Sequence, residues 1–287
     1  RGLGDVYKRQ PRVRATRRHK GEKSLGIAAD YRWGPRRGRG GAQALTDNRP
    51  MPHETMKLLA IETSTDTLSV AVGGPGVRAD FQGPGAAQAS ATLLPAVQDL
   101  LRQAGWSLAA LDAIAFARGP GAFTGLRTAC AVAQGLAYGA RSAAHPEGLP
   151  VLPIDTLLAL AEEARWREVE AGRPVPGVIV ALLDARMDEI YVAAYRCTDS
   201  GLETRPLQPP RLCAPAALAD WLAGVLPAGS DPANGLLAGN ALAVYAADLA
   251  TLPGRRCDAL PTAAALLRLA PGLLAAAHRG ILYVDEV

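Results

Sequence analysis

The 287-residue sequence lacks several features that define common classes of protein. No apolar run reaches the roughly 18 to 20 residues that a membrane-spanning helix needs, because Gly, Pro, Arg or Asp interrupts each candidate. No CxxC pair occurs, and the four cysteines are widely spaced: Cys130, Cys197, Cys213 and Cys257. Such spacing favours reduced thiols over a disulfide framework or a metal site. We therefore expect a cytoplasmic protein without a membrane segment.

Residue types that carry common catalytic chemistry are also scarce. None of the four histidines has a second histidine four residues away, the spacing that turns two ligands of one metal ion to the same helix face. They are His19, His53, His145 and His278. The only lysine after residue 56 is Lys57, no Gly-Lys-Ser/Thr motif follows a glycine loop, and no serine lies in a GxSxG elbow. These absences argue against a metalloprotease, a Walker A nucleotidase and a serine hydrolase.

Charge divides the chain into two unlike segments. Residues 1–55 hold 14 Lys plus Arg and 5 acidic residues, whereas residues 56–287 hold 17 and 22. The first segment is rich in Arg and Gly and poor in apolar residues, so it cannot bury a core. We interpret it as a disordered tail or as upstream sequence joined to the gene, in preference to a nucleic-acid-binding arm or an organelle transit segment. Periodic sequence begins at Met56.

A strand–acid–turn–strand pattern occurs twice in the sequence. In each copy an apolar strand precedes one acidic residue, and a second strand follows another acidic residue four positions later. The acidic residues are Glu62 and Asp66 in the first copy, and Asp184 and Asp188 in the second. The strands are 57–61 and 68–72, with a hairpin into 77–81, and then 178–183 and 190–195. The two copies are 122 residues apart, from Glu62 to Asp184. A repeat at this separation suggests two related lobes, and chance is the alternative explanation.

Apolar residues at helical spacing predict helices between these strands. The helices cover 93–104, 123–138 and 157–167, and a further strand covers 112–117. Strands that alternate with helices indicate an α/β protein. Two lobes that each open with a hairpin resemble the two-lobe actin-like ATPase fold (ASKHA, RNase H-like), with duplicated mixed sheets flanked by helices. We expect an N-terminal lobe at 56–153 and a C-terminal lobe at 154–287, after the extension at 1–55.

The strongest local motif is the loop at 118–127, which reads RGPGAFTGLR between a predicted strand and a predicted helix. Gly119 and Gly121 allow a tight turn with positive φ. The N–H groups that open the helix near Phe123 and Thr124 lack internal partners and are suited to an anion, which the arginines at both ends of the loop would neutralise. The loop is equally consistent with a helix start that binds nothing.

Small residues recur at every fourth position of the helix behind this loop: Gly125, Ala129, Ala133 and Ala137. Such a stripe lets another helix approach closely, by default within the chain, where the predicted helix 93–104 is available, or else from another chain. If the stripe is an interface, Ala129→Arg or Ala133→Arg should block association and leave the fold intact. The reason is that the added bulk would disrupt a packed contact.

The segment 119–139, GPGAFTGLRTACAVAQGLAYG, is similar to the signature of the TsaB family, also called YeaZ. Further segments resemble the family in its order and spacing: MKLLAIETSTDTLSVAV at 56–72, LLPAVQDLL at 93–101, LPVLPIDTLLALA at 149–161 and LLDARMDEIYVAAY at 182–195. The resemblance is weaker after residue 195, and nothing in 1–55 matches.

This resemblance implies a non-catalytic subunit that binds and activates a TsaD-type threonylcarbamoyltransferase. The complex would modify N6 of the adenosine 3′ of the anticodon in tRNAs that read ANN codons, with a TsaE-type ATPase as its third member. The resemblance also implies a homodimer when the chain is alone and contact with tRNA only through the complex. It implies no cofactor bound by this chain itself, with ATP or ADP at the partner interface. The catalytic relative holds its metal through H-x-x-x-H, whereas residues 88–94 read QASATLL here.

The resemblance places the partner interface on the helices 93–104 and 123–138. Its candidate residues are Leu93, Leu94, Val97, Leu101, Gly125, Ala129, Ala133 and Ala137. The candidates for binding a nucleotide or an anion are Glu62, Ser64, Gly119, Gly121, Phe123, Thr124, Arg127 and Asp184. We expect no catalytic residue and no metal ligand. The alternative is an active ASKHA-fold enzyme, a nucleotide-dependent kinase or carbamoyltransferase, which Glu62, Asp184 and the glycine loop favour.

Overall fold

A computed structural model describes residues 56–85, 89–198, 200–226 and 234–278. All of these residues belong to one compact unit. The interpretation of 1–55 as an extension lies outside the described residues. Among the described helices, none is both long and apolar enough to cross a bilayer.

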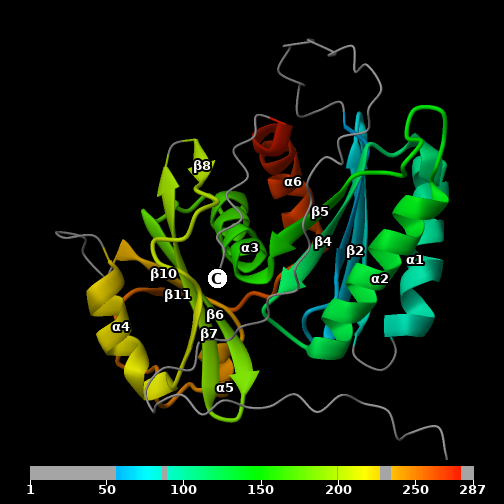
Figure 1. Cartoon of the computed structure of the whole chain (residues 1–287). Helices are drawn as coiled ribbons and strands as arrows, with labels where there is room; N and C mark the ends of the chain where they lie inside the picture. Colours follow the sequence, from blue (N-terminus) through cyan, green and yellow to red (C-terminus); the bar gives the residue numbers. More distant parts are fainter. Residues whose placement is uncertain (1–55, 86–88, 199, 227–233, 279–287) are drawn as a thin grey trace, which may run out of the picture. The chain divides into compact units, whose positions relative to one another are not determined.

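The first sheet has five strands in the order β3-β2-β1-β4-β5 (Figure 1). Its strands are β1 (Leu58–Glu62), β2 (Thr67–Gly74), β3 (Val77–Pro84), β4 (Ala113–Gly119) and β5 (Val151–Asp155). β1 pairs antiparallel with β2 and parallel with β4. Every residue of β1 is buried, as expected for a central strand that is covered on both faces.

The second sheet repeats the plan of the first. Its order is β11-β10-β6-β7-β8, and β9 also pairs with β7. The strands are β6 (Val178–Arg186), β7 (Glu189–Thr198), β8 (Gly201–Leu202), β9 (Arg211–Cys213), β10 (Leu236–Ala238) and β11 (Arg255–Cys257). The antiparallel hairpin β6–β7 has a parallel neighbour, β10, just as the β1–β2 hairpin has β4. Two mixed sheets of the same plan confirm the predicted fold class.

The helices agree with the prediction in the first part of the chain and extend it in the second. They are α1 (Ala89–Ala104), α2 (Phe123–Gly139), α3 (Thr156–Glu170), α4 (Leu218–Val225), α5 (Ala241–Val244) and α6 (Ala263–His278). Two short 3-10 segments are η2 (Leu108–Ala110) and η3 (Pro215–Ala217). The predicted helices 93–104, 123–138 and 157–167 correspond to α1, α2 and α3. No helix was predicted from the sequence where α4, α5 and α6 lie.

Helices cover both faces of each sheet (Figure 1). α1 and α2 pack on the face of the first sheet that carries Leu59 and Ile61. α3 and α6 form a middle layer between the two sheets, and one apolar core runs from Ala60 in β1 to Ala181 in β6. α4 and α5 cover the other face of the second sheet. The alternation of side chains along each strand therefore supplies two separate cores per sheet.

α6 returns to the first sheet although it follows the second sheet in sequence. It contacts β1, β2 and β4, and it also contacts α3. The predicted boundary between residues 153 and 154 falls inside β5. The lobe limits stay a prediction, and the packing of α6 shows that both ends of the described chain contribute to the environment of the first sheet.

Candidate functional site

Within the glycine loop, residues 119–122 join β4 to α2 and pack against the turn that follows β1. Gly119 and Gly121 have φ angles of 117° and 155°, which residues with a Cβ atom rarely adopt. A Cβ atom on Gly121 would lie 2.5 Å from the Ser64 carbonyl oxygen. The Ala122 N–H donates a hydrogen bond to that carbonyl, with 2.7 Å between nitrogen and oxygen. Glycine is therefore required for this close approach.

The first turn of α2 contacts the same segment. The Thr63 hydroxyl donates to the Gly125 carbonyl at 2.7 Å, and a Cβ atom on Gly125 would overlap the Thr63 carbonyl oxygen. The structure thus brings Glu62 and Ser64 next to the glycine loop and the start of α2. These residues were predicted as parts of one site, and their proximity agrees with that prediction; ligand binding at this place stays a prediction.

Glu62 is fully buried at the end of β1. Its Oε1 accepts a hydrogen bond from the Ser64 N–H at 2.6 Å, whereas its Oε2 has no hydrogen-bond partner among the described residues. Burial raises the pKa of Glu62 to about 7, although hydrogen bonding from Ser64 acts in the opposite direction. The ionised form of this carboxylate would repel a phosphate, so Glu62 does not by itself favour an anion at the loop.

The arginines at the two ends of the loop have other contacts. Arg118 donates from two nitrogens to the two carboxylate oxygens of Asp155, each at 3.0 Å, so its charge is already paired. The Arg127 guanidinium lies 3.9 Å from the centre of the exposed Phe123 ring. Within the described chain Arg127 makes no salt bridge. A cation is therefore present beside the loop, on the outer side of α2.

The second strand–acid–turn unit is built around Asp184. Its Oδ1 accepts hydrogen bonds from the Tyr245 hydroxyl and the Arg186 N–H, both at 3.0 Å, and its own N–H donates to Asn240 Oδ1 at 3.0 Å. Asp184 therefore holds the β6–β7 turn and the start of α5 in place, and it lies on the second sheet, apart from the glycine loop in sequence. The Arg186 side chain also reaches Asp66 in the first turn, at 2.7 Å. The two duplicated turns are thus in direct contact.

Most of the residues that were predicted to form the partner interface are buried within the chain, so that prediction is corrected. Seven of the eight are buried in the chain's own core: Leu93, Val97, Leu101, Gly125, Ala129, Ala133 and Ala137. Together with Leu59 and Ile61 they fill the space between the first sheet and its two covering helices. The small stripe lets α2 lie close to the sheet, so it serves an internal contact. Arginine at Ala129 or Ala133 would therefore disrupt the fold and could not report on association alone.

The opposite face of α2 is exposed and also carries small residues. A Cβ atom on Gly135 or Gly139 would meet nothing within 4 Å, and Ala131 is exposed as well. This outer face of α2 consists of Phe123, Thr124, Arg127, Ala131, Gln134, Gly135, Tyr138 and Gly139. Tyr138 is 66% exposed, and Leu94 on α1 is the predicted interface residue that is also exposed. The outer face therefore offers small residues in its middle and an aromatic ring near each end.

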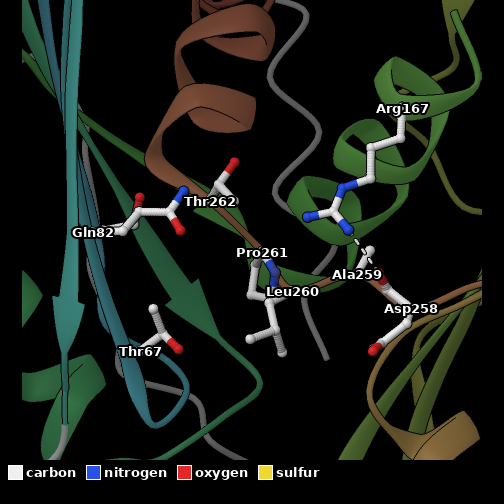
Figure 2. A pocket seen from close by; sticks show the side chains of 9 residues that line it. Thr67, Gln82, Arg167, Asp258, Ala259, Leu260, Pro261 and Thr262 are labelled. Atoms are coloured by element: carbon white, nitrogen blue, oxygen red, sulfur yellow. Dashed lines mark hydrogen bonds between the residues drawn. The ribbon is translucent and has the colours of Figure 1, made fainter. Parts of the chain in front are cut away.

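A recess of about 230 Å³ lies between the first sheet and the segment before α6 (Figure 2). Thr67, Ser69 and Gln82 line it from β2 and β3, and residues 258–262 line it from the segment before α6. The Arg167 guanidinium enters from α3 and donates to the Asp258 carbonyl at 2.6 Å. None of the predicted site residues lines this recess. Its walls belong to the contact between the middle layer and the first sheet.

The cysteines are unpaired thiols, as the sequence analysis predicted. All four lie within the described residues and form no disulfide. Burial raises the pKa of the Cys197 thiol to about 11 and also raises those of Cys213 and Cys257, which disfavours the reactive thiolate. In the part of the chain that the structure covers, no group of three or more His, Cys, Asp or Glu side chains is arranged to hold a metal ion.

Comparison with known proteins finds matches whose names refer to tRNA modification. The family model described as TsaD, tRNA N6-adenosine threonylcarbamoyltransferase, matches residues 84–231. The tRNA threonylcarbamoyladenosine biosynthesis protein TsaB of Escherichia coli (strain K12) is 40% identical over 148 residues, which are 51% of this chain and 58% of that protein. Its namesake in Haemophilus influenzae is 38% identical over 138 residues, 48% of this chain and 53% of that protein. The chain thus spans just over half the length of these curated relatives.

Solved structures extend the similarity over most of the described residues. YeaZ from Pseudomonas aeruginosa is 35% identical with a TM-score of 0.61, and the match covers 79% of this chain and 94% of that one. A second structure, of an uncharacterized protein from Pseudomonas aeruginosa with similarity to peptidase YeaZ, is 34% identical with a TM-score of 0.63 and the same coverage. The predicted two-lobe actin-like fold is that of these relatives. The chain therefore belongs to the TsaB (YeaZ) family.

Proposed function

We propose that this chain is a non-catalytic subunit in the biosynthesis of threonylcarbamoyladenosine in tRNA. In this role it binds and activates a TsaD-type threonylcarbamoyltransferase, which modifies N6 of the adenosine 3′ of the anticodon in tRNAs that read ANN codons. The names of the TsaB relatives support the pathway. The family model, whose description names the transferase itself, supports a structural kinship between this chain and the proposed partner.

The observation that carries the proposed partnership is the outer face of α2. Gly135 and Gly139 leave open space on an otherwise regular helix, and small residues permit the closest approach of a second helix. Phe123 and Tyr138 are large, exposed rings near the two ends of this face. Aromatic and arginine side chains are enriched where proteins bind one another. A helix of the partner would lie along this face and bury both rings.

The non-catalytic part of the proposal rests on the sequence. Residues 88–94, QASATLL, occupy the place where the related transferases carry H-x-x-x-H. Without two histidines one helical turn apart, this chain has no counterpart of that metal site. Transfer of the threonylcarbamoyl group is therefore assigned to the partner. Purified chain that modified tRNA without any partner would contradict this assignment.

The test of the interface is a Gly135→Arg variant. Gly135 lies in a helix and faces open space, so arginine should fit and should even improve helix propensity by roughly 1 kcal/mol. Its bulk and charge in the middle of a helix–helix contact should weaken binding to a TsaD-type protein by about 100-fold, which is about 2.7 kcal/mol. Calorimetry measures the affinity, and a tRNA threonylcarbamoylation assay with all partners measures the activation.

The matched control is Gly224→Arg in α4. Gly224 is also helical, exposed and free of neighbours within 4 Å at its Cβ position, and it lies on the second sheet's side of the chain. This variant should bind and activate as the parent chain does. Normal binding by Gly135→Arg would remove the outer face of α2 from the proposal.

The remaining partners follow from the same proposal. Alone, the chain would use the outer face of α2 to form a homodimer, which the partner replaces. A TsaE-type ATPase would join the complex, ATP or ADP would bind at the partner interface, and tRNA would contact this chain only through the assembly. Light scattering after gel filtration tests self-association, since Gly135→Arg should then shift the chain from dimer to monomer.

A second candidate function is an active ASKHA-fold kinase or carbamoyltransferase. The observation that favours it is Glu62, a buried carboxyl with a free oxygen and a pKa of about 7 beside the glycine loop, since such groups occur at catalytic sites. This function requires nucleotide binding by the isolated chain. Calorimetry with ATP and Mg²⁺ tests this enzymatic function. Absence of nucleotide binding by the isolated chain would rule the function out and leave the partner proposal unaffected.

A further inference from the structure

The two sheets meet through the middle layer of helices. α3 packs on β6 and β7 of the second sheet and also contacts β4 and β5 of the first, whereas α6 packs on β1, β2, β4 and β5 of the first. The two helices also contact each other directly. If α3 moves with the second sheet, a rotation between the sheets shifts α3 against α6 and against the first sheet, so the side chains at these contacts decide how freely that happens.

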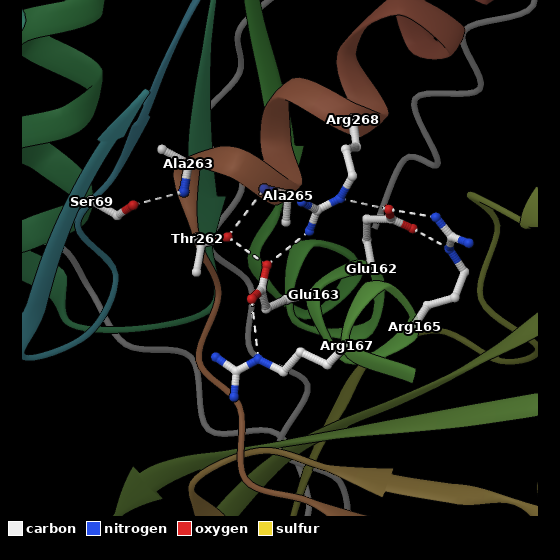
Figure 3. Close-up of polar contacts among 9 residues, drawn as sticks. All are labelled: Ser69, Glu162, Glu163, Arg165, Arg167, Thr262, Ala263, Ala265 and Arg268. Carbon is white, nitrogen blue, oxygen red and sulfur yellow. Dashed lines mark hydrogen bonds and ion pairs between the residues drawn. The ribbon is translucent and has the colours of Figure 1, made fainter. Parts of the chain in front are cut away.

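Buried charges lie at this contact (Figure 3). Glu162 and Glu163 are neighbours on α3, with side chains only 4% and 12% exposed. Arg268 of α6 donates to both of them, to Glu162 Oε1 at 2.9 Å and to Glu163 Oε2 at 2.8 Å. The Arg268 guanidinium also lies 5.0 Å from the centre of the Trp166 ring. Displacing α6 would remove this cation from two buried carboxylates, each of which would keep one arginine of α3, and losing a partner of a buried charge is unfavourable.

Hydrogen bonds continue from these charges to the first sheet. The Thr262 hydroxyl donates to Glu163 Oε2 at 2.9 Å and accepts from the Ala265 N–H at 3.1 Å, so it also caps the start of α6. The Ala263 N–H donates to Ser69 Oγ in β2 at 3.0 Å. All three bonds are buried. A continuous set of polar contacts thus links α3, the first turn of α6 and β2 (Figure 3).

The charge state of Glu163 depends on these contacts. Burial by itself raises the pKa of this carboxyl, but hydrogen bonds from Arg268 and Thr262 outweigh burial and the pKa is lowered. The contacts from α6 therefore favour the ionised form of this buried carboxyl. Arg165 and Arg167, on α3 itself, bond to the same two glutamates from the other side.

We propose that Glu162, Glu163, Thr262 and Arg268, the α3–α6 cluster, hold the two sheets in a single relative orientation, so that the described residues move as one body. Two lobes joined through a small polar interface would be expected to move relative to each other. Here the apolar core is continuous through the middle layer, and the charges within it are paired. The inference concerns the chain alone and does not depend on the proposed partner.

The test compares Arg268→Met with Arg165→Met in the full chain by hydrogen exchange and mass spectrometry. Both variants remove a guanidinium bonded to Glu162 and keep a long apolar side chain, but only Arg268 comes from α6. In Arg268→Met the amides of α6, β1 and β2 should exchange about tenfold faster than in the parent chain, because these elements open locally. In Arg165→Met they should change by less than about twofold. Equal exchange in the two variants overturns the proposal.

A second variant keeps the test decisive if Arg268→Met does not fold. Thr262→Val removes the bond to Glu163 and the cap on the Ala265 N–H, and it preserves shape and all charges. It should raise exchange in α6 and β2 and leave α4 and β9 unchanged. Parent-like exchange throughout Thr262→Val overturns the proposal, whatever Arg268→Met does.

Discussion

Glu62 is completely buried, and within the part of the chain that the structure describes only one of its two oxygens accepts a hydrogen bond. Its folded-state pKa of about 7 lies above the ordinary value of 4.5, so the folded chain binds this proton more tightly than the unfolded chain does. The resulting stabilisation is complete below the unfolded-state pKa. It is lost as the pH rises through the folded-state pKa, because ionising a buried carboxyl without a counter-charge is unfavourable.

Glu62→Gln should therefore change how stability depends on pH. The glutamine carbonyl can accept the hydrogen bond from the Ser64 N–H, and the side chain never ionises. Relative to the parent chain, the variant should become more stable between about pH 5 and pH 8, by on the order of 3 kcal/mol at the upper end. Urea unfolding at several pH values measures this difference.

The control for this prediction is Glu147→Gln, because Glu147 is exposed. Its unfolding free energy should follow that of the parent chain at every pH. Parallel pH profiles for Glu62→Gln and the parent chain would show that the Glu62 carboxyl is solvated or paired in solution.

At the scale of elements, α2 shows how a correct pattern can be assigned to the wrong side. Small residues recur on two of its faces, Gly125 to Ala137 on one and Ala131 to Gly139 on the other. Helical periodicity tells which residues share a face, but it does not tell which face meets the sheet. The sheet lies against the first face because Gly125 allows contact with the Thr63 carbonyl. The second face is left for solvent or a partner.

A pair of substitutions on α2 distinguishes the two faces. Ala133 is fully buried whereas Ala131, two positions earlier, is exposed. Ala133→Arg should destabilise the chain by about 3 kcal/mol or more, since it overpacks the core and buries a charge. Ala131→Arg should leave the melting temperature within a few degrees of the parent value. Thermal unfolding followed by circular dichroism compares them, and an intact fold in Ala133→Arg would contradict the internal role of the stripe.

Element prediction was accurate where periodicity was strong. The nine strands and helices predicted between residues 57 and 195 all occur, with ends that differ by a few residues. α6 was not predicted from the sequence, although its segment AAALLRLAPGLLAAAH is rich in the helix-forming residues Ala and Leu. Asn240 and Tyr245, which hold Asp184, were missed because their partner is more than 50 residues away in sequence.

On the scale of the whole molecule, polar contacts between distant segments lie in different environments. The α3–α6 cluster is buried, whereas the ion pair between Asp66 and Arg186 joins side chains that are 75% and 70% exposed. Water screens an exposed pair and leaves little net stabilisation, while water compensates a buried carboxylate poorly when one of its cations is lost. Ion pairs with similar distances between nitrogen and oxygen therefore contribute very differently to the free energy of unfolding.

Asp66→Asn and Arg268→Met should separate these contributions. Loss of the exposed pair in Asp66→Asn should reduce the unfolding free energy by at most about 1 kcal/mol, and by less at high salt. Loss of the buried cation in Arg268→Met should reduce it by roughly 3 kcal/mol or more, nearly independently of salt. Urea unfolding at low and high ionic strength gives both values, and a larger effect for Asp66→Asn would reverse this ranking.

The sequence by itself determined the α/β class, the duplicated strand–acid–turn units, the glycine loop and the family, because these depend on local periodicity, on glycine at tight turns and on residues close together in the chain. Tertiary structure alone decided which face of α2 is buried, that Glu62 lacks a partner for one oxygen, and that α6 returns to bind α3 through Arg268. Each of these depends on which distant segments pack together, and packing is fixed by the shapes of whole surfaces, which no single stretch of sequence contains.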